Sequence, residues 1–355
     1  MKDSDGVLNE YKSYISKKWT FIFVTIILLI MISFISISIG AADISLSEIF
    51  NTMFGDGEEW IYNVIWKIRI PRVLAGILAG MGLSVAGVVM QSILRNPLGS
   101  PYTLGVSQAA AFGAAFAVIV LGAGTVQSSN ADAVILNNPY LITLSAFFWS
   151  LTSTAGILML SKMRDATPET LVLAGIALGS LFTAGMTSLE YFASDVELAS
   201  VIFWTFGDMG KATWRDFGIM ALVLIPIALY LIKNSWNYNA LDSGDETAKS
   251  LGVNVEKIRI IGMLFASLAT ALIVSFFGII GFVGLVVPHI VRKIIGGDER
   301  FLIPASAIFG GVFLLASDTV ARTVISPVVL PVGILTSFLG APLFLYLLVK
   351  GRSYW

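Results

Sequence analysis

Hydrophobic residues occur in long unbroken runs along this chain, separated by short polar stretches. Many runs reach about 20 residues, the length that a helix needs to cross a hydrocarbon core of roughly 30 Å. A membrane β-barrel would instead alternate polar and apolar positions. The pattern therefore predicts an all-α polytopic membrane protein with about ten transmembrane helices, at 19–39, 70–94, 105–123, 139–161, 168–192, 214–233, 258–278, 280–296, 302–324 and 331–349.

Composition supports this class. The chain has 355 residues, of which 56% are hydrophobic and 13% charged, and soluble domains carry about twice that share of charge. The net charge of −1 includes no basic domain for nucleic acid. The absence of cysteine excludes disulfides, thiolate metal sites and thiol catalysis. Small residues four apart, as at Gly76–Gly80 and Gly175–Gly179, are typical of helices packed closely in lipid.

The distribution of positive charge predicts the orientation. Residues 1–20 are polar and precede a run long enough to span, so they do not form a secretory signal peptide. Ten spans with the N-terminus inside leave 16 of the 22 lysines and arginines on the cytoplasmic side, as the positive-inside rule requires. We expect a cytoplasmic segment at 1–18, a single transmembrane domain at 19–350 and a cytoplasmic tail at 351–355, in the cell (cytoplasmic) membrane.

A polar insert at 241–256 interrupts the apolar runs. Within it, Ser243 is positioned to cap a short helix, with Glu246 returning the hydrogen bond of a capping box. Asp245 and Lys249 are four apart and can pair, and Gly252 is a natural helix stop. Such a helix suits contact with a partner protein. A solvated loop helix is the alternative.

The spans themselves carry almost no ionisable residue at their centres, since Glu190 and Asp318 lie near outer ends. Proton- or ion-coupled transporters usually keep such residues at mid-membrane, and a membrane hydrolase would need a base or metal ligands there. The single histidine, His289, cannot form a metal cluster alone. No Walker A loop is present, because Gly210-Lys211-Ala212 lacks the required glycine spacing and hydroxyl residue. Any energy for transport must come from elsewhere.

Four collinear groups of residues carry a family resemblance. They are KIRIPRVLAGILAGMGLSVAGVVMQSILRNPLGSPYTLGV (67–106), LVLAGIALGSLFTAG (171–185), SGDETAKSLGVN (243–254), and GFVGLVVPHIVRKIIGGDERFLIPASAIFGG (281–311) with ASDTVARTV and LPVGILTSFLGAPLFLYLL after it. Together they resemble the membrane permeases of type II ABC importers, the ferric-siderophore, haem and cobalamin uptake family. The resemblance implies the BtuC-like ABC permease fold and a homodimer, or a close heterodimer, around one path. It also implies two ABC ATPase subunits and an external substrate-binding protein.

The resemblance also implies roles for particular residues. In such permeases the polar insert holds the helices that couple to the ATPases, here Gly244, Asp245, Glu246, Ala248, Leu251 and Gly252. Arginines at the outer rim pair with the binding protein and match Arg69, Arg72 and Arg322; the alternatives are contact with lipid headgroups or internal pairs such as Asp318–Arg322. The inner gate corresponds to Asn96, Pro97, Leu98, Thr167 and Pro168, which otherwise form structural turns.

The implied function is ATP-driven import of a metal chelate. No bond chemistry is expected in this chain, which should bind no cofactor or metal, because ATP and Mg²⁺ are used by the partner subunits. We expect the path to have a mostly apolar lining. Ferric siderophore is the favoured substrate and cobalamin or another corrinoid the runner-up, with haem and molybdate also open. An ion-coupled secondary transporter and a membrane enzyme of lipid or peptide metabolism are the remote alternatives, and the missing central carboxylates argue against both.

Overall fold

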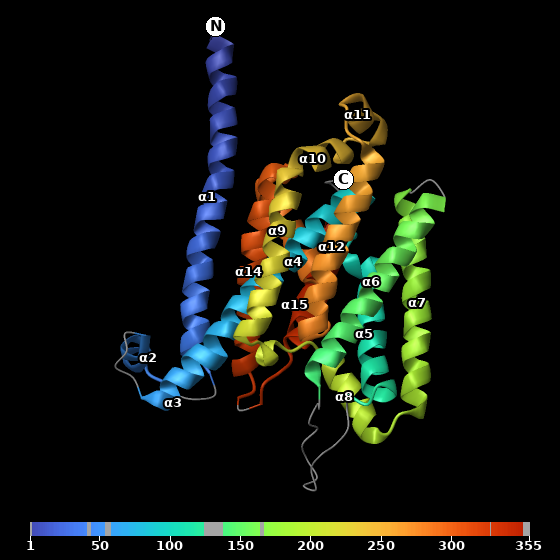
Figure 1. Ribbon diagram of the computed structural model, residues 1–355. Coiled ribbons are helices and arrows are strands. Elements are labelled where there is room, and N and C mark those ends of the chain that lie inside the picture. Colours follow the sequence, from blue (N-terminus) through green and yellow to red (C-terminus); the bar gives the residue numbers. More distant parts are fainter. Residues whose placement is uncertain are drawn as a thin grey trace.

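The computed structural model describes residues 2–40, 44–53, 58–123, 138–163, 167–326 and 328–350, and every regular element within them is helical (Figure 1). Seven helical segments are long and apolar enough to cross a membrane. They contain α1 (Lys2–Ser38), α4 (Ile70–Leu94, continuing from α3, Glu59–Tyr62, and η1, Asn63–Arg69), α6 (Pro139–Met163), α7 (Pro168–Phe192), α9 (Trp214–Lys233), α12 (Val255–Phe277) and α14 (Glu299–Thr323).

Three further passes are shorter. They are α5 (Val106–Ala115) with the π-helical turn η3 (Phe116–Val120), α13 (Val283–Ile295) and α15 (Val332–Lys350). At 1.5 Å per residue the 13 residues of α13 extend for about 20 Å, less than the roughly 30 Å of hydrocarbon. The predicted span at 280–296 corresponds to α13, which is shorter by a few residues. The all-helical class and the positions of the other spans are confirmed, and ten is an approximate count of the passes.

The passes alternate in direction, which defines two ends of the bundle (Figure 1). The α11 end, uppermost in Figure 1, carries α10 (Ser235–Asp242) and α11 (Asp245–Ser250). The opposite end, called the arginine end after Arg69, Arg72 and Arg322, carries α2 (Leu46–Met53), α3 and α8 (Asp195–Thr205). From residue 2 the expected N-terminal segment 1–18 is continuous with the first span in α1. The expected tail at 351–355 lies outside the described residues.

Helix α4 forms the centre of the bundle, and 18 of its 25 residues are buried. It packs against α14 and α13 with almost no side chain between the backbones. A Cβ atom on Gly80 would lie 2.2 Å from the carbonyl oxygen of Gly310, and one on Gly87 would lie 1.8 Å from that of Gly284. Helices in lipid gain packing energy from such close approach, so the glycines of α4 set the spacing of the core.

The segment between α12 and α13 is irregular although it lies inside the bundle. Phe282 has a left-handed backbone with φ of 66° and precedes the first turn of α13. The hydroxyl of Tyr102 donates a hydrogen bond to the carbonyl of Ile280. The amide of Asp208 donates to the carbonyl of Phe277 at 2.8 Å. Because non-helical backbone at membrane depth needs partners within the protein, these bonds explain how the interruption is tolerated.

The close contact of α4 with α13 leads to a prediction for stability. Replacing Gly87 with Ala places a methyl group where the Gly284 backbone lies, so we expect a loss of about 1–3 kcal/mol in the free energy of unfolding. Gly218→Ala in α9 is the matched control, since nothing lies within 4 Å of the added carbon. Melting temperatures of the two purified variants in detergent measure the difference. Equal melting temperatures would contradict the proposed role of this contact.

Candidate functional site

The polar insert folds as two short helices, α10 and α11, that project at one end of the bundle (Figure 1). The N-cap of α11 is Gly244, with φ of 107° and no capping side chain. Ser243 instead ends α10 with helical dihedral angles, and its hydroxyl donates to the carbonyl of Asn239 at 3.4 Å. The predicted Ser243 capping box is therefore wrong, because α10 extends far enough to use this serine at its own C-terminus.

The other end of α11 follows the prediction. Gly252 adopts φ of 83°, and its amide donates to the carbonyl of Lys249 at 3.0 Å. The amide of Val253 donates to the carbonyl of Ala248 at 3.0 Å, which completes a Schellman turn. Ala248 is fully buried beneath the helix. Leu251, at the C-terminal end of the helix, is 66% exposed. The turn therefore presents an apolar side chain to whatever lies beyond this end.

Ion pairs hold α11 on the bundle. Both oxygens of Asp245 accept hydrogen bonds from Arg259 of α12, at 3.0 and 3.1 Å. Arg95, at the end of α4, lies 3.4 Å from the same carboxylate. The predicted pair between Asp245 and Lys249 is wrong, since among the described residues the ion pairs of Asp245 go to these two arginines. The helix is thus fixed to α4 and α12.

A second cluster joins α10 to α14 and α1. The side-chain nitrogen of Asn239 donates a hydrogen bond to Asp298 at 3.1 Å. The side-chain oxygen of Asn239 accepts a hydrogen bond from the backbone amide of Glu299 at 2.8 Å. Asp298 also accepts hydrogen bonds from buried Lys18, at 3.2 Å, and from Arg300, at 2.6 Å. Burial alone would raise the pKa of the Asp298 carboxyl. The hydrogen bonds outweigh that effect and hold its pKa well below the usual range.

The predicted gate residues form two separate turns. The side-chain oxygen of Asn96 accepts from the amide of Leu98 at 2.9 Å, and Pro97 lies between them. Thr167 caps α7 by accepting from the amide of Thr170 at 3.3 Å, with Pro168 as the first helical residue. Within the described residues no hydrogen bond or ion pair joins the two turns. Within a single chain, they form one turn after the C-terminus of α4 and another at the N-terminus of α7.

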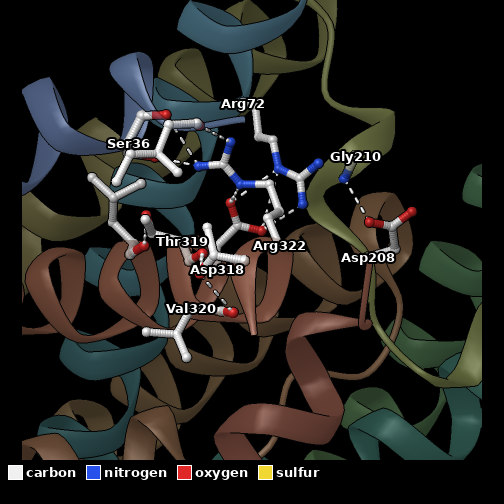
Figure 2. A network of polar contacts seen from close by, with 11 residues as sticks. Ser36, Arg72, Asp208, Gly210, Asp318, Thr319, Val320 and Arg322 are labelled. Carbon is white, nitrogen blue, oxygen red and sulfur yellow. Dashed lines mark hydrogen bonds and ion pairs between the residues drawn. The ribbon is translucent and has the colours of Figure 1, made fainter. Parts of the chain in front are cut away.

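The opposite end holds an arginine cluster around one carboxylate (Figure 2). Arg72 and Arg322 both pair with Asp318, at 2.7 and 3.2 Å. Their side chains are only 12% and 8% exposed, and that of Asp318 is 2% exposed. Arg322 also donates to the hydroxyl of Ser36 at 2.7 Å. The internal Asp318–Arg322 pair that the sequence left open is therefore present, and Arg72 is a partner of Asp318 that the sequence did not reveal.

Arg69 lies nearby but has other contacts. It is 5% exposed, and it donates to the carbonyls of Ile37 and Ser38 at 2.6 and 2.9 Å. These carbonyls end α1 and would otherwise lack donors. Arg69, Arg72 and Arg322 thus gather around the ends of α1, α4 and α14, with Asp318 as the carboxylate that pairs with two of them. Other carboxylates lie at the same end, and Figure 2 shows Asp208 beside this cluster.

The ion pairs and hydrogen bonds of these clusters anchor helix ends to one another. Within the described residues, no cluster of three or more histidines, cysteines or carboxylates could hold a metal ion. Both polar clusters lie at the ends of the bundle. Asn239, Asp298 and Arg259 were not predicted as part of the α11 site. A sequence signal exists only for Asp298, which follows Gly296-Gly297 and precedes a helix, as an N-cap residue does.

Comparison with known proteins gives a consistent result. The FecCD transport family matches residues 28–350. An ABC transporter permease protein of Methanocaldococcus jannaschii, MJ0087, is 54% identical over 96% of this chain and 97% of its own length. The hemin transport system permease protein HmuU of Yersinia pestis is 34% identical over 92% of this chain and 95% of its own length. The Fe(3+)-citrate import system permease protein YfmE of Bacillus subtilis is 35% identical over 92% of this chain and 94% of its own length.

One further relative widens the range of transported compounds. The vitamin B12 import permease BtuC of Vibrio vulnificus is 31% identical over 92% of this chain and 94% of its own. Among solved structures, an inward-facing metal-chelate type ABC transporter aligns with a TM-score of 0.82 at 29% identity, covering 93% of this chain and 99% of that one. The relatives thus share the fold and carry different cargo.

The arginine cluster generates a stability prediction. Asp318→Asn leaves Arg72 and Arg322 in a buried site without their carboxylate, which costs roughly 3–5 kcal/mol when one partner of a buried pair is lost. Asp195→Asn, an exposed acidic residue at the same end, is the control. We expect only Asp318→Asn to lower the melting temperature of the purified protein markedly. A wild-type melting temperature for this variant would show that the cluster contributes little to stability.

Proposed function

The chain belongs to the FecCD transport family, and we propose that it is the permease subunit of an ATP-driven importer of ferric siderophore. The coarser assignment, an ABC importer permease of the metal-chelate, haem or vitamin B12 type, follows from the family and from the structural match. The finer assignment names the substrate, the orientation and the partners. An external binding protein would deliver the chelate, and two ATPase subunits would supply the energy.

The observation that carries this proposal is the anchored insert. α11 is a polar helix at the end of the bundle, with Leu251 and Glu246 exposed and Ala248 buried. It has exposed groups for a partner on one side and ion pairs to α4 and α12 on the other. A coupling element needs both properties, because it must bind the ATPase and pass on its movement. We assign this role to Gly244, Asp245, Glu246, Ala248, Leu251 and Gly252, which places the α11 end in the cytoplasm.

The arginine end would then face outward and receive the binding protein. Arg72 and Arg322 keep a small exposed fraction while sharing one carboxylate, so an acidic residue of the partner could add a second counter-charge. Complementary charges of this kind steer association and fix its register. Arg69 is more deeply buried, and we assign it to shaping this surface by holding the end of α1. The docking surface is thus an extension of the structural cluster.

Transport would follow from alternating access between two permease copies. ATP binding and hydrolysis in the partner subunits move α11, and the bundle exchanges an outward-open state for an inward-open one. The turns at Asn96–Leu98 and Thr167–Pro168 would meet across the two copies as the inner gate. Their capped, proline-containing geometry suits a rigid edge. No covalent step takes place in this chain.

Substrate identity is tested by uptake in cells with and without this chain, offered labelled ferric siderophore and labelled cobalamin in parallel. Loss of iron uptake alone on deletion is the expected result. Loss of cobalamin uptake alone would select a corrinoid importer of the same family. Loss of neither would reject both assignments and direct the test to haem and molybdate.

The coupling role gives a separate prediction. Glu246→Lys and Leu251→Asp change exposed side chains of α11 and leave the Asp245 ion pairs in place. We expect each to lower uptake by about tenfold or more, equivalent to roughly 1.4 kcal/mol of lost ATPase affinity, with unchanged amounts in the membrane. Lys12→Glu, a charge reversal on exposed α1 at the same end, is the control. Normal uptake and normal co-purification of the ATPase by both α11 variants would remove this role.

A further inference from the structure

A fully buried carboxyl group lies where α10 packs against the ends of α4 and α14. It belongs to Glu299, the first residue of α14, which is 0% exposed. One of its oxygens, Oε1, accepts hydrogen bonds from the hydroxyl of Ser92 in α4, at 3.1 Å, and from Arg292 in α13, at 3.3 Å. Side chains from α4 and α13 thus converge on the start of α14.

The other oxygen of Glu299 meets a second carboxyl group. Glu299 Oε2 is buried, and within the described residues no N–H or hydroxyl group donates to it. The carboxyl group of Asp242, the last residue of α10, is in hydrogen-bonding contact with Glu299 and with Ser92. Asn239, which binds the backbone amide of Glu299, is three residues earlier in α10. Positions three apart share a helix face, so α10 presents both side chains to the start of α14.

The charge around this pair of carboxyl groups is out of balance. The other charged or titratable groups near it, from α1, α4, α10, α13 and α14, are Lys18, Arg95, Tyr238, Arg292, Asp298 and Arg300. Asp298 pairs with two of these cations, and Arg95 pairs with Asp245. Arg292 is thus the cation in contact with Glu299. Two adjacent carboxylates beside one arginine leave a negative charge and a buried oxygen without partners, which is costly. One shared proton removes both costs.

We propose that Glu299 is protonated and donates its proton to Asp242, and that this proton-sharing pair is the positioning element that passes movement of the polar insert to α14. The inference deepens the proposed coupling role and rests on it. Asp242 is exposed to solvent, so the proton can be released to water and taken up again through it. When the proton is lost, the two carboxylates repel each other and the contact between α10 and α14 weakens.

The pair reaches passes that the ion pairs of α11 do not. Asp245 ties α11 to α4 and α12. Asp242 and Glu299 instead connect α10 to α14, and Arg292 adds α13. Asp318 lies 19 residues after Glu299, about 28 Å along α14 at 1.5 Å per residue, in the arginine cluster of the opposite end. One helix therefore joins the insert to the surface that we assign to the binding protein.

The test uses the complete importer in proteoliposomes and measures uptake of labelled ferric siderophore and labelled cobalamin together with ATP hydrolysis. At neutral pH, Glu299→Gln should keep uptake near the wild-type level, because its side-chain amide donates to Asp242 as the carboxylic acid does. Glu299→Leu should lower uptake about fivefold or more, the effect of leaving buried polar groups unsatisfied. Glu10→Gln, an exposed carboxylate of α1 at the same end, is the control and should change neither activity.

The dependence of uptake on pH tests the proton itself. As the solution becomes alkaline, wild-type uptake should fall about two- to tenfold relative to that of Glu299→Gln, the range for one lost hydrogen bond. The amide of the variant has no proton to release in this range, so its contact with Asp242 persists. A purely structural role of Glu299 would give the wild type and Glu299→Gln the same pH profile.

Each outcome separates this proposal from the import function. Equal pH profiles, or a loss in Glu299→Gln as large as in Glu299→Leu, would overturn the shared proton while the importer assignment stands. The ATPase subunits should co-purify with both variants, and their loss would overturn the transmission role in favour of one in assembly. Uptake of neither compound by the wild type would reject both proposed substrates, and the pH profile of ATP hydrolysis would then decide on the pair. Where melting temperatures show that Glu299→Leu is unfolded, the profile of Glu299→Gln decides alone.

Discussion

The bundle depends on the distance between α4 and its neighbours. In lipid the hydrophobic effect gives helices little reason to associate, so packing at close range must hold them together. Gly80 against Gly310 and Gly87 against Gly284 bring backbones into direct contact along one helix. The short helix α13 can be tolerated in the bundle because α4 covers it. The same close contact brings the Arg72 turn and the Arg95 turn, at opposite ends of α4, into line with α14 and α12.

Charge is arranged to leave the middle of the molecule neutral. Asp318 gathers arginines at one end, and Asp245 and Asp298 do so at the other. Between them the middle of α7, from Gly175 to Ala184, carries no charged residue. A carrier that holds its cargo by strong ion pairs would release it slowly, whereas hydrogen bonds to neutral groups are individually weak and reversible. This distribution fits a protein that is driven by partner subunits and need not bind an ion itself.

Local features of the structure were predictable, and those made by distant residues were not. The apolar runs located the helices, because membrane thickness fixes their length. The stop at Gly252 and the Asp318–Arg322 pair were visible, because both involve residues within one turn. The Arg72–Asp318 pair joins residues 246 apart, and only the packing of α4 on α14 creates it. The cap of α11 was assigned wrongly because Ser243 could serve either helix, and the length of α10 decided between them.

The irregular segment between α12 and α13 has a consequence for how the gene can vary. Connecting segments normally lie on the surface and accept inserted or deleted residues. Here Phe277 and Ile280 accept hydrogen bonds from Asp208 and Tyr102, and the amide of Gly333 donates to the carbonyl of Gly207 at 3.3 Å. Three connections are joined inside the bundle, so one extra residue in any of them would put its backbone partners out of register. Changes of length in this set of loops would therefore be selected against.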